Sequence, residues 1–305
     1  MDMRVILSQM AVLFILLAVG FVGGKVKLLS VETGKLLSKI VINITTPCTI
    51  LNSVMGGDVN ITVGETAVFL LLAFLAYLLY ILISIPMVRA LGGDKENRGL
   101  YSYMAAFGNT AFMGFPVIIA IFGAASAFYV ALFNIPFILL TFSVGIILIS
   151  GKGRKFDPKV FLNPSIIAAL AAALIALTGF RAPMVVAESV RHIGGMTTPG
   201  SMLVIGSTLA SVSFRDVFSE WRLYPVALVK LIVMPVVAWL VFRQLVGSEV
   251  LLGIIVILSG MPAAAMSAMI AIEYGGNGRI ASGGVSMTTL LSGATIPLIV
   301  YLLLA

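Results

Sequence analysis

The chain has 305 residues, of which 60% are hydrophobic and only 10% are charged. Soluble domains carry about 25% charged residues, so this composition excludes an ordinary soluble protein and predicts an integral protein of the lipid bilayer. The formal net charge of +7 would suit a nucleic-acid partner. Lysines and arginines gathered on one membrane face explain it better, so no nucleic acid is expected.

Ten apolar segments are long enough to cross a bilayer as helices, because about 20 apolar residues span its hydrocarbon core. The first follows Arg4 without a clear small-residue cleavage site. It is therefore interpreted as a retained span and not as a signal peptide. The ten predicted spans cover approximately residues 5–24, 35–56, 65–90, 99–122, 125–150, 160–180, 189–213, 222–243, 249–274 and 278–304.

Lysine and arginine are distributed unequally between the loops that these spans define. Fourteen fall on one face of the membrane and four on the other. Positively charged loops stay in the cytoplasm, so the richer face is predicted to be cytoplasmic. We therefore expect a multi-pass protein of the cell (plasma or inner) membrane with both termini on the outer face.

Landmarks in the first half of the chain recur in the second half. Thr45-Thr46-Pro47 returns as Thr197-Thr198-Pro199 after 152 residues, and Gly108 corresponds to Gly260 at the same offset. Such internal repeats are typical of secondary transporters. Five spans per half would insert the second half upside down. The predicted fold class is all-α integral membrane, with ten transmembrane helices as two inverted five-helix repeats, 1–152 and 153–305, and no soluble domain.

Helix-breaking residues lie near the middles of the second, fourth, seventh and ninth predicted spans. Non-helical backbone at this depth must be buried in protein or line a watery cavity. Half-helix N-termini that point inward carry partial positive charge, which suits a carboxylate or a similar anion. The candidate substrate-binding residues are Asn43, Thr46 and Pro47 in the second span, Gly108, Asn109, Thr110 and Pro116 in the fourth, and Ser259, Met261 and Pro262 in the ninth. The alternative is that these residues only kink helices or shape walls, and for the Thr-Thr-Pro pair the two readings stand about even.

Two ionisable residues, Lys230 and Glu273, fall within predicted spans, where charged groups are functional candidates by default. Both are candidates for coupling or gating. The alternatives are that Lys230 extends to the cytoplasmic interface and that Glu273 is solvated at a span end. His192, the one histidine, is expected at the surface and not in a proton relay.

Motifs for chemical catalysis are absent from the sequence. It contains no phosphate-binding loop ending in Lys-Ser/Thr and no His-Glu-x-x-His. With one histidine and one cysteine, Cys48, neither a metal site nor a disulfide within the chain is expected. The chain is therefore predicted not to be an enzyme and to need no cofactor, although transport could be coupled to H⁺ or Na⁺.

The segment from Gly108 to Pro116, Gly-Asn-Thr-Ala-Phe-Met-Gly-Phe-Pro, resembles the Gly-Asn-x-x-Phe-x-Gly-x-Pro signature of the auxin efflux carrier family. That family includes plant PIN-type carriers and bacterial malate and malonate carriers. Met261-Pro262, followed by Glu273-Tyr274-Gly275, resembles the family's ninth span. The likeness extends over essentially the whole chain, but the long cytoplasmic loop of the plant members is missing.

The resemblance implies that the broken fourth and ninth helices cross at the substrate site, with Asn109, Pro116 and Pro262 at the crossover. It also implies elevator-type movement and a homodimer. The related bile-acid/sodium symporters share this architecture, so sodium coupling stays open. We hypothesise a secondary carrier of small organic anions such as carboxylates. The alternatives are a sodium-coupled carrier of the bile-acid symporter kind, a channel, and a receptor that binds without transporting.

Overall fold

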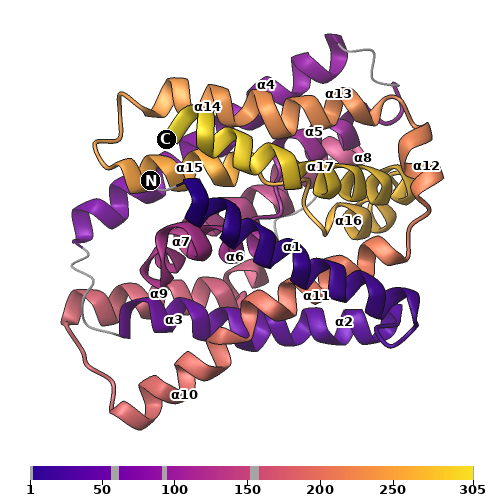
Figure 1. The fold of residues 1–305 in the computed structure, drawn as a ribbon. Coiled ribbons are helices and arrows are strands. Elements are labelled where there is room, and N and C mark those ends of the chain that lie inside the picture. The colour runs from indigo at the N-terminus through magenta and orange to yellow at the C-terminus, as the bar shows by residue number, and fades with distance from the viewer. Residues whose placement is uncertain (1–2, 56–61, 91–94, 152–157, 305) are drawn as a thin grey trace.

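The protein is all-helical over the residues that the computed structural model describes, 3–55, 62–90, 95–151 and 158–304 (Figure 1). No strand occurs within these ranges, where one isolated antiparallel bridge joins Gly108 to Ala263. The all-α part of the predicted fold class is confirmed.

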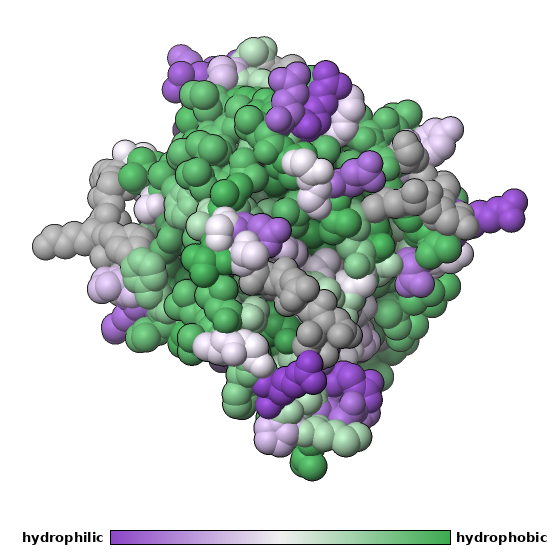
Figure 2. Space-filling view, turned by 90° about the vertical axis from the view of Figure 1, so that its left-hand side faces the viewer, coloured by the Kyte–Doolittle hydropathy of each residue, from purple (hydrophilic) through white to green (hydrophobic). Residues whose placement is uncertain are grey.

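Five helical stretches are long and apolar enough to cross a membrane: Arg4–Lys25, Val63–Ala90, Ala124–Ser150, Leu223–Phe242 and Gly278–Leu304. They correspond to the first, third, fifth, eighth and tenth predicted spans. Apolar residues cover most of the face drawn in Figure 2, as expected where side chains meet lipid. The other five predicted spans are largely helical but are not among these five stretches, and their crossing of the bilayer stays a prediction.

The helices pack in two groups, and each group takes helices from both halves of the chain. In the first group α1 lies along α11, and α3 packs against α9 and α10. This group, in the lower part of Figure 1, contains α1 (Met3–Lys25), α2 (Val31–Ile40), η1 (Val41–Thr45), α3 (Thr46–Met55), α9 (Pro164–Thr178), α10 (Met184–Gly195) and α11 (Thr197–Ala210).

The second group surrounds the two interrupted helices. In it α4 packs against α5 and α7, α14 against α15, and α16 against α17. Its members are α4 (Val63–Ala90), α5 (Arg98–Ala106), η2 (Thr110–Gly114), α6 (Phe115–Phe122), α7 (Ala127–Leu140), η4 (Thr141–Gly145), α8 (Ile146–Ser150), α13 (Leu223–Leu228), η6 (Val229–Val233), α14 (Met234–Phe242), α15 (Glu249–Ser259), α16 (Ser267–Glu273) and α17 (Gly278–Leu304). Three short connecting helices are η3 (Ala124–Ser126), η5 (Pro158–Leu162) and α12 (Phe214–Ser219).

The seam between α1 and α11 is unusually close because glycines face it. A Cβ atom on Gly206 would lie 2.1 Å from the Leu17 carbonyl oxygen, and one on Gly20 would lie 2.6 Å from the Leu203 carbonyl oxygen. Small residues let membrane helices approach backbone to backbone, which strengthens their van der Waals contact. This seam joins a helix of the first half to a helix of the second.

Wide turns precede three of the prolines in the helices. The π-helical turns η1, η2 and η6 end two residues before Pro47, Pro116 and Pro235, respectively. Proline lacks an N–H and clashes with the carbonyl four residues earlier, and a local π turn relieves both.

The second and seventh predicted spans contain helix-breaking residues, but neither is broken by extended backbone, which agrees with the alternative that these residues only shape the helices. At Thr45-Thr46-Pro47 the helix passes through η1 directly into α3. At Thr197-Thr198-Pro199 only Met196 separates α10 from α11, and it keeps a helical backbone. Within the described ranges, the helices of the fourth and ninth predicted spans stop near the middle of the span and then restart.

Candidate functional site

The interruptions of the fourth and ninth predicted spans meet and cross. Helix α5 ends at Ala106 and helical structure resumes at Thr110, whereas α15 ends at Ser259 and α16 begins at Ser267. The Asn109 N–H donates to the Pro262 carbonyl oxygen at 2.7 Å, and the Ala264 N–H donates to the Phe107 carbonyl oxygen at 3.0 Å. Two main-chain hydrogen bonds therefore join segments that lie more than 150 residues apart in sequence.

The residues of the crossing explain why the chain does not stay helical there. Pro262 has no N–H to leave unpaired, and the Ala263 N–H donates to the Thr288 hydroxyl oxygen on α17 at 3.0 Å. Gly108 permits close approach, since a Cβ atom there would lie 3.1 Å from Lys230 Nζ and 3.3 Å from the Met261 Cβ. The Phe107 ring stacks on Tyr103 with centroids 4.8 Å apart. Every one of these residues is buried.

Asn109 caps the helix that restarts after the crossing. Its side-chain oxygen accepts a hydrogen bond from the Phe112 N–H at 3.2 Å, as N-cap residues commonly do. Its side-chain nitrogen makes no hydrogen bond to the described residues, although the side chain is 4% exposed. The N-terminus of the helix Thr110–Phe122 and a spare amide donor therefore lie together at the crossing.

A buried polar pair supports the start of this helix. The Thr110 hydroxyl donates to the Asn134 side-chain oxygen on α7 at 2.7 Å, and the Asn134 amide nitrogen donates to the Val130 carbonyl oxygen at 2.8 Å. The sequence reasoning missed Asn134 and Thr288. The one signal for Asn134 was a single amide in an otherwise apolar predicted span.

Lys230 reaches the crossing from η6. Its side chain is 1% exposed, and it is the only charged residue among the buried side chains that the structure describes. The Nζ atom donates to the Ser259 carbonyl oxygen at 3.0 Å and, at 3.5 Å, to the Ala106 carbonyl oxygen. The Tyr80 ring centroid lies 5.8 Å from Nζ. Lys230 therefore points into the protein and not toward the membrane interface.

The remaining candidates divide between the crossing and the periphery. Pro116 is buried at the start of α6, and Ser259 is the last residue of α15. Glu273 is exposed at the end of α16, away from the buried crossing residues. Asn43 is also exposed, and its side chain donates to the Lys39 carbonyl oxygen on its own helix.

The two Thr-Thr-Pro motifs meet within the first helix group. Thr46 is buried and Pro47 half-buried beside them. The Thr197 hydroxyl donates to the Thr45 hydroxyl at 2.9 Å and lies 2.7 Å from the Thr49 hydroxyl. These contacts join α11 to η1 and α3 and form a polar seam that lies far in sequence from the crossing.

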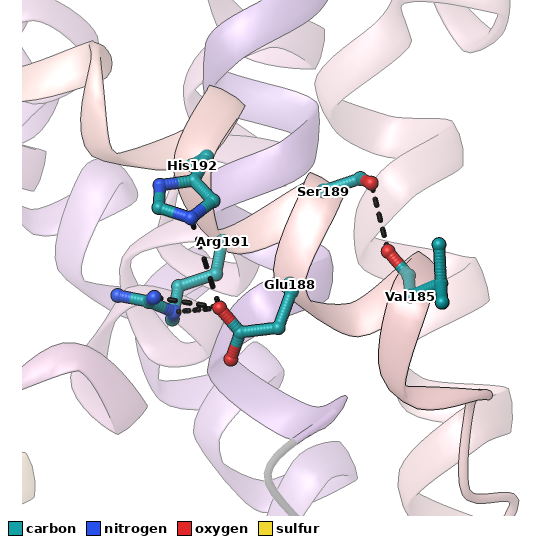
Figure 3. Close-up of polar contacts among 5 residues, drawn as sticks. All are labelled: Val185, Glu188, Ser189, Arg191 and His192. Carbon is teal, nitrogen blue, oxygen red and sulfur yellow. Dashed lines mark hydrogen bonds and ion pairs between the residues drawn. The ribbon is translucent and has the colours of Figure 1, made fainter.

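His192 belongs to an exposed cluster on α10 (Figure 3). Glu188 accepts hydrogen bonds from Arg191, with an Nη2–Oε2 distance of 2.6 Å, and the His192 Nε2 lies 3.8 Å from the same carboxylate oxygen. The His192 side chain is 74% exposed. Across the described residues, no group of three or more His, Cys, Asp or Glu side chains could hold a metal ion.

The family described as "Membrane transport protein" matches residues 5–160 and 157–300. The chain belongs to this family. The match confirms the resemblance to the auxin efflux carriers. With its five apolar helices, this membrane transport protein is a multi-pass membrane transporter.

Two archaeal relatives resemble this membrane transport protein over nearly their whole length. An uncharacterized transporter of Methanothermobacter thermautotrophicus is 24% identical over 288 residues, covering 93% of this chain and 94% of the relative. An uncharacterized transporter of Methanocaldococcus jannaschii is 24% identical over 306 residues, covering 96% and 97%. Both relatives are named as transporters, and neither name gives a substrate.

Proposed function

We propose that this protein is a secondary active carrier of small organic anions such as carboxylates, with its binding site at the crossing of α5–α6 and α15–α16. The observation that carries the proposal is the buried polar geometry of that crossing. The spare amide nitrogen of Asn109 and the N-terminus of the helix Thr110–Phe122 offer hydrogen bonds to an anion. The one buried basic side chain near it is Lys230, and no carboxylate is buried among the described residues.

The sign of the site favours an anion over a cation. The groups offered at the start of Thr110–Phe122 are main-chain N–H donors and the Asn109 amide, which favour an anion and do not coordinate a cation. A broken helix supplies main-chain donors that would be unsatisfied in lipid alone. Helix α16 has only seven residues, so its N-terminus adds little field, and we assign the anion to the end that begins at Thr110.

Movement would follow the grouping of the helices. The crossing lies wholly within the second group, while α1, α3 and α9–α11 form the first. We propose that the second group carries the site across the bilayer against the first, as in an elevator. We further propose that the chain crosses the membrane ten times as two inverted repeats and that both termini lie outside. We also propose that the protein forms a homodimer. The contact between Thr45 and Thr197, which are 152 residues apart, supports the repeat because equivalent residues meet only near a two-fold axis.

The proposal is tested by reconstituting the purified protein in liposomes with labelled mono- and dicarboxylates under imposed proton and sodium gradients. Saturable, gradient-driven accumulation and counterflow of one anion would support the carrier. Flux that does not saturate would favour a channel through the crossing. Binding of an anion without flux, in folded protein, would favour a receptor and contradict the proposal.

A further inference from the structure

The C-terminal ends of two half-helices converge on one buried nitrogen. Lys230 Nζ donates to Ser259, the last residue of α15, and to Ala106, the last residue of α5. A helix C-terminus carries the equivalent of roughly half a negative charge. Two such ends amount to about one negative charge, which one ammonium group balances.

The surroundings of this nitrogen resemble those of a bound monovalent cation. Its partners are main-chain carbonyl oxygens, and the Tyr80 ring faces it at 5.8 Å. No carboxylate is buried near it among the described side chains. Gly108 leaves the space that the ammonium fills, since a Cβ atom there would lie 3.1 Å from Nζ.

We infer that the Lys230 ammonium is a tethered cation that holds the two broken helices together. Lys230 is then a positioning residue for the substrate site, not a ligand of the substrate. The crossing needs no Na⁺ to stay assembled. This inference rests on the proposed function only in so far as it predicts transport.

The inference is tested first by stability, which needs no substrate. Lys230→Ala removes three carbon atoms and the ammonium group, and the removed part has the size of a propylammonium ion. The variant is expected to melt roughly 5–15 °C lower than the wild type, because buried charged hydrogen bonds and packing are lost together. Propylammonium chloride should recover most of this loss, whereas 1-propanol and tetramethylammonium should not. Lys39→Ala, at an exposed lysine, should respond to none of them.

A second variant separates charge from packing. Lys230→Met keeps most of the side-chain volume and removes the charge, so it should be destabilised like Lys230→Ala without rescue. If Lys230→Met were as stable as the wild type, or if 1-propanol rescued Lys230→Ala as well as propylammonium does, Lys230 would only fill space and the inference would fail. A rise in the wild-type melting temperature with sodium chloride over choline chloride would overturn it as well.

Transport gives the third test. With the carboxylate that the liposome assay identifies, Lys230→Ala should lose about tenfold or more in rate, and propylammonium should restore it. Wild-type flux should be equal in sodium and choline buffers when the proton gradient is held constant. If the wild type transports no carboxylate, the proposed function fails, while the melting experiments still decide the role of Lys230. If Lys230→Ala keeps full flux, the inference fails and the proposed function survives.

Discussion

Asn109 combines two tasks within one side chain. Its oxygen caps the helix that restarts after the crossing, and its nitrogen has no partner among the described residues. A cap alone would need only the oxygen, and serine or aspartate would serve as well. The unused donor, buried at the crossing, is the reason that we propose Asn109 as a binding residue.

Replacing Asn109 by alanine should therefore abolish transport and leave the fold intact. The lost cap is expected to cost about 1 kcal/mol of stability, which a protein of this size tolerates. Asn163→Ala is the matched control, because Asn163 caps α9 in the same way through the Ser165 N–H. Liposome flux and melting temperature would be measured for both. Normal transport by Asn109→Ala would remove Asn109 from the site.

The Thr110–Asn134 pair offers a second test, of stability. Thr110→Val leaves the buried Asn134 oxygen without its donor, which should cost about 1–3 kcal/mol. Thr289→Val is the control, since its equally buried hydroxyl donates only to the Val285 carbonyl oxygen of its own helix. It should cost less than about 1 kcal/mol. Equal losses in chemical unfolding would show that the pair contributes nothing special.

The sequence predicted the crossing residues better than their partners. Asn109 and Pro262 stood out because amides and prolines are rare in the middle of apolar spans. Asn134 was missed because a lone amide can bond within its own helix, as its nitrogen does with Val130. The burial of Lys230 could not be predicted either, because a lysine about two turns from a span end can reach the interface equally well.

At the level of elements, a proline in the sequence does not predict whether its helix continues or breaks. Pro47 and Pro235 follow π turns and leave their helices continuous. At Phe107–Asn109 and Gly260–Met266 the chain instead leaves the helical conformation, where glycine, Pro262 and a neighbouring backbone combine. The Thr-Thr-Pro motifs, by contrast, do not interrupt their helices with extended backbone. A helix can stop inside the protein only where a second chain segment bonds the main-chain groups that are left unpaired. The sequence alone does not show which segment lies beside them.

The seam between α1 and α11 gives a prediction for packing. A methyl group on Gly206 would meet the α1 backbone, so Gly206→Ala should push the helices apart and cost roughly 1–3 kcal/mol. Gly195→Ala is the control, since a Cβ atom there meets nothing within 4 Å. That helical substitution should be neutral or slightly stabilising. Thermal melting of both variants in detergent measures the difference, and a neutral Gly206→Ala would show that the seam is loose.

For the whole molecule, the halves of the sequence do not form separate bodies. Each packed group draws on both halves, and both chain ends lie toward the left-hand side of Figure 1. An even number of crossings would place the ends this way. The bias of lysine and arginine then predicts which side is cytoplasmic.

Orientation can be measured with single cysteines in a Cys48→Ser background. The cysteines are introduced as Lys27→Cys, in the loop after α1, and as Arg181→Cys, in the loop before α10. Both positions are exposed. An impermeant maleimide added to intact cells should label position 181 and not position 27. Labelling in the reverse pattern, or of both, would contradict the predicted topology.

The proposed movement predicts that fixing one helix group to the other stops transport. A Cβ atom on Gly293 of α17 would lie 2.9 Å from the Phe14 ring of α1, so cysteines at positions 14 and 293 can be joined by a short bifunctional thiol reagent. Cross-linking is expected to abolish carboxylate accumulation. As control, cysteines at positions 34 and 207 join α2 to α11 within the first group, where a Gly34 Cβ would lie 3.3 Å from Ser207 Oγ. Full flux after cross-linking positions 14 and 293 would argue against an elevator.

The joint at the crossing is made from main-chain atoms, through the Asn109 N–H and the Ala264 N–H. These main-chain hydrogen bonds do not depend on the identity of most side chains around them. No further main-chain hydrogen bond can be added between the two segments by these residues, because Pro262 has no N–H and the Ala263 N–H already donates to Thr288. Relatives with the same joint could therefore diversify their cargo by exchanging the side chains that project from it, without rebuilding the path of the chain.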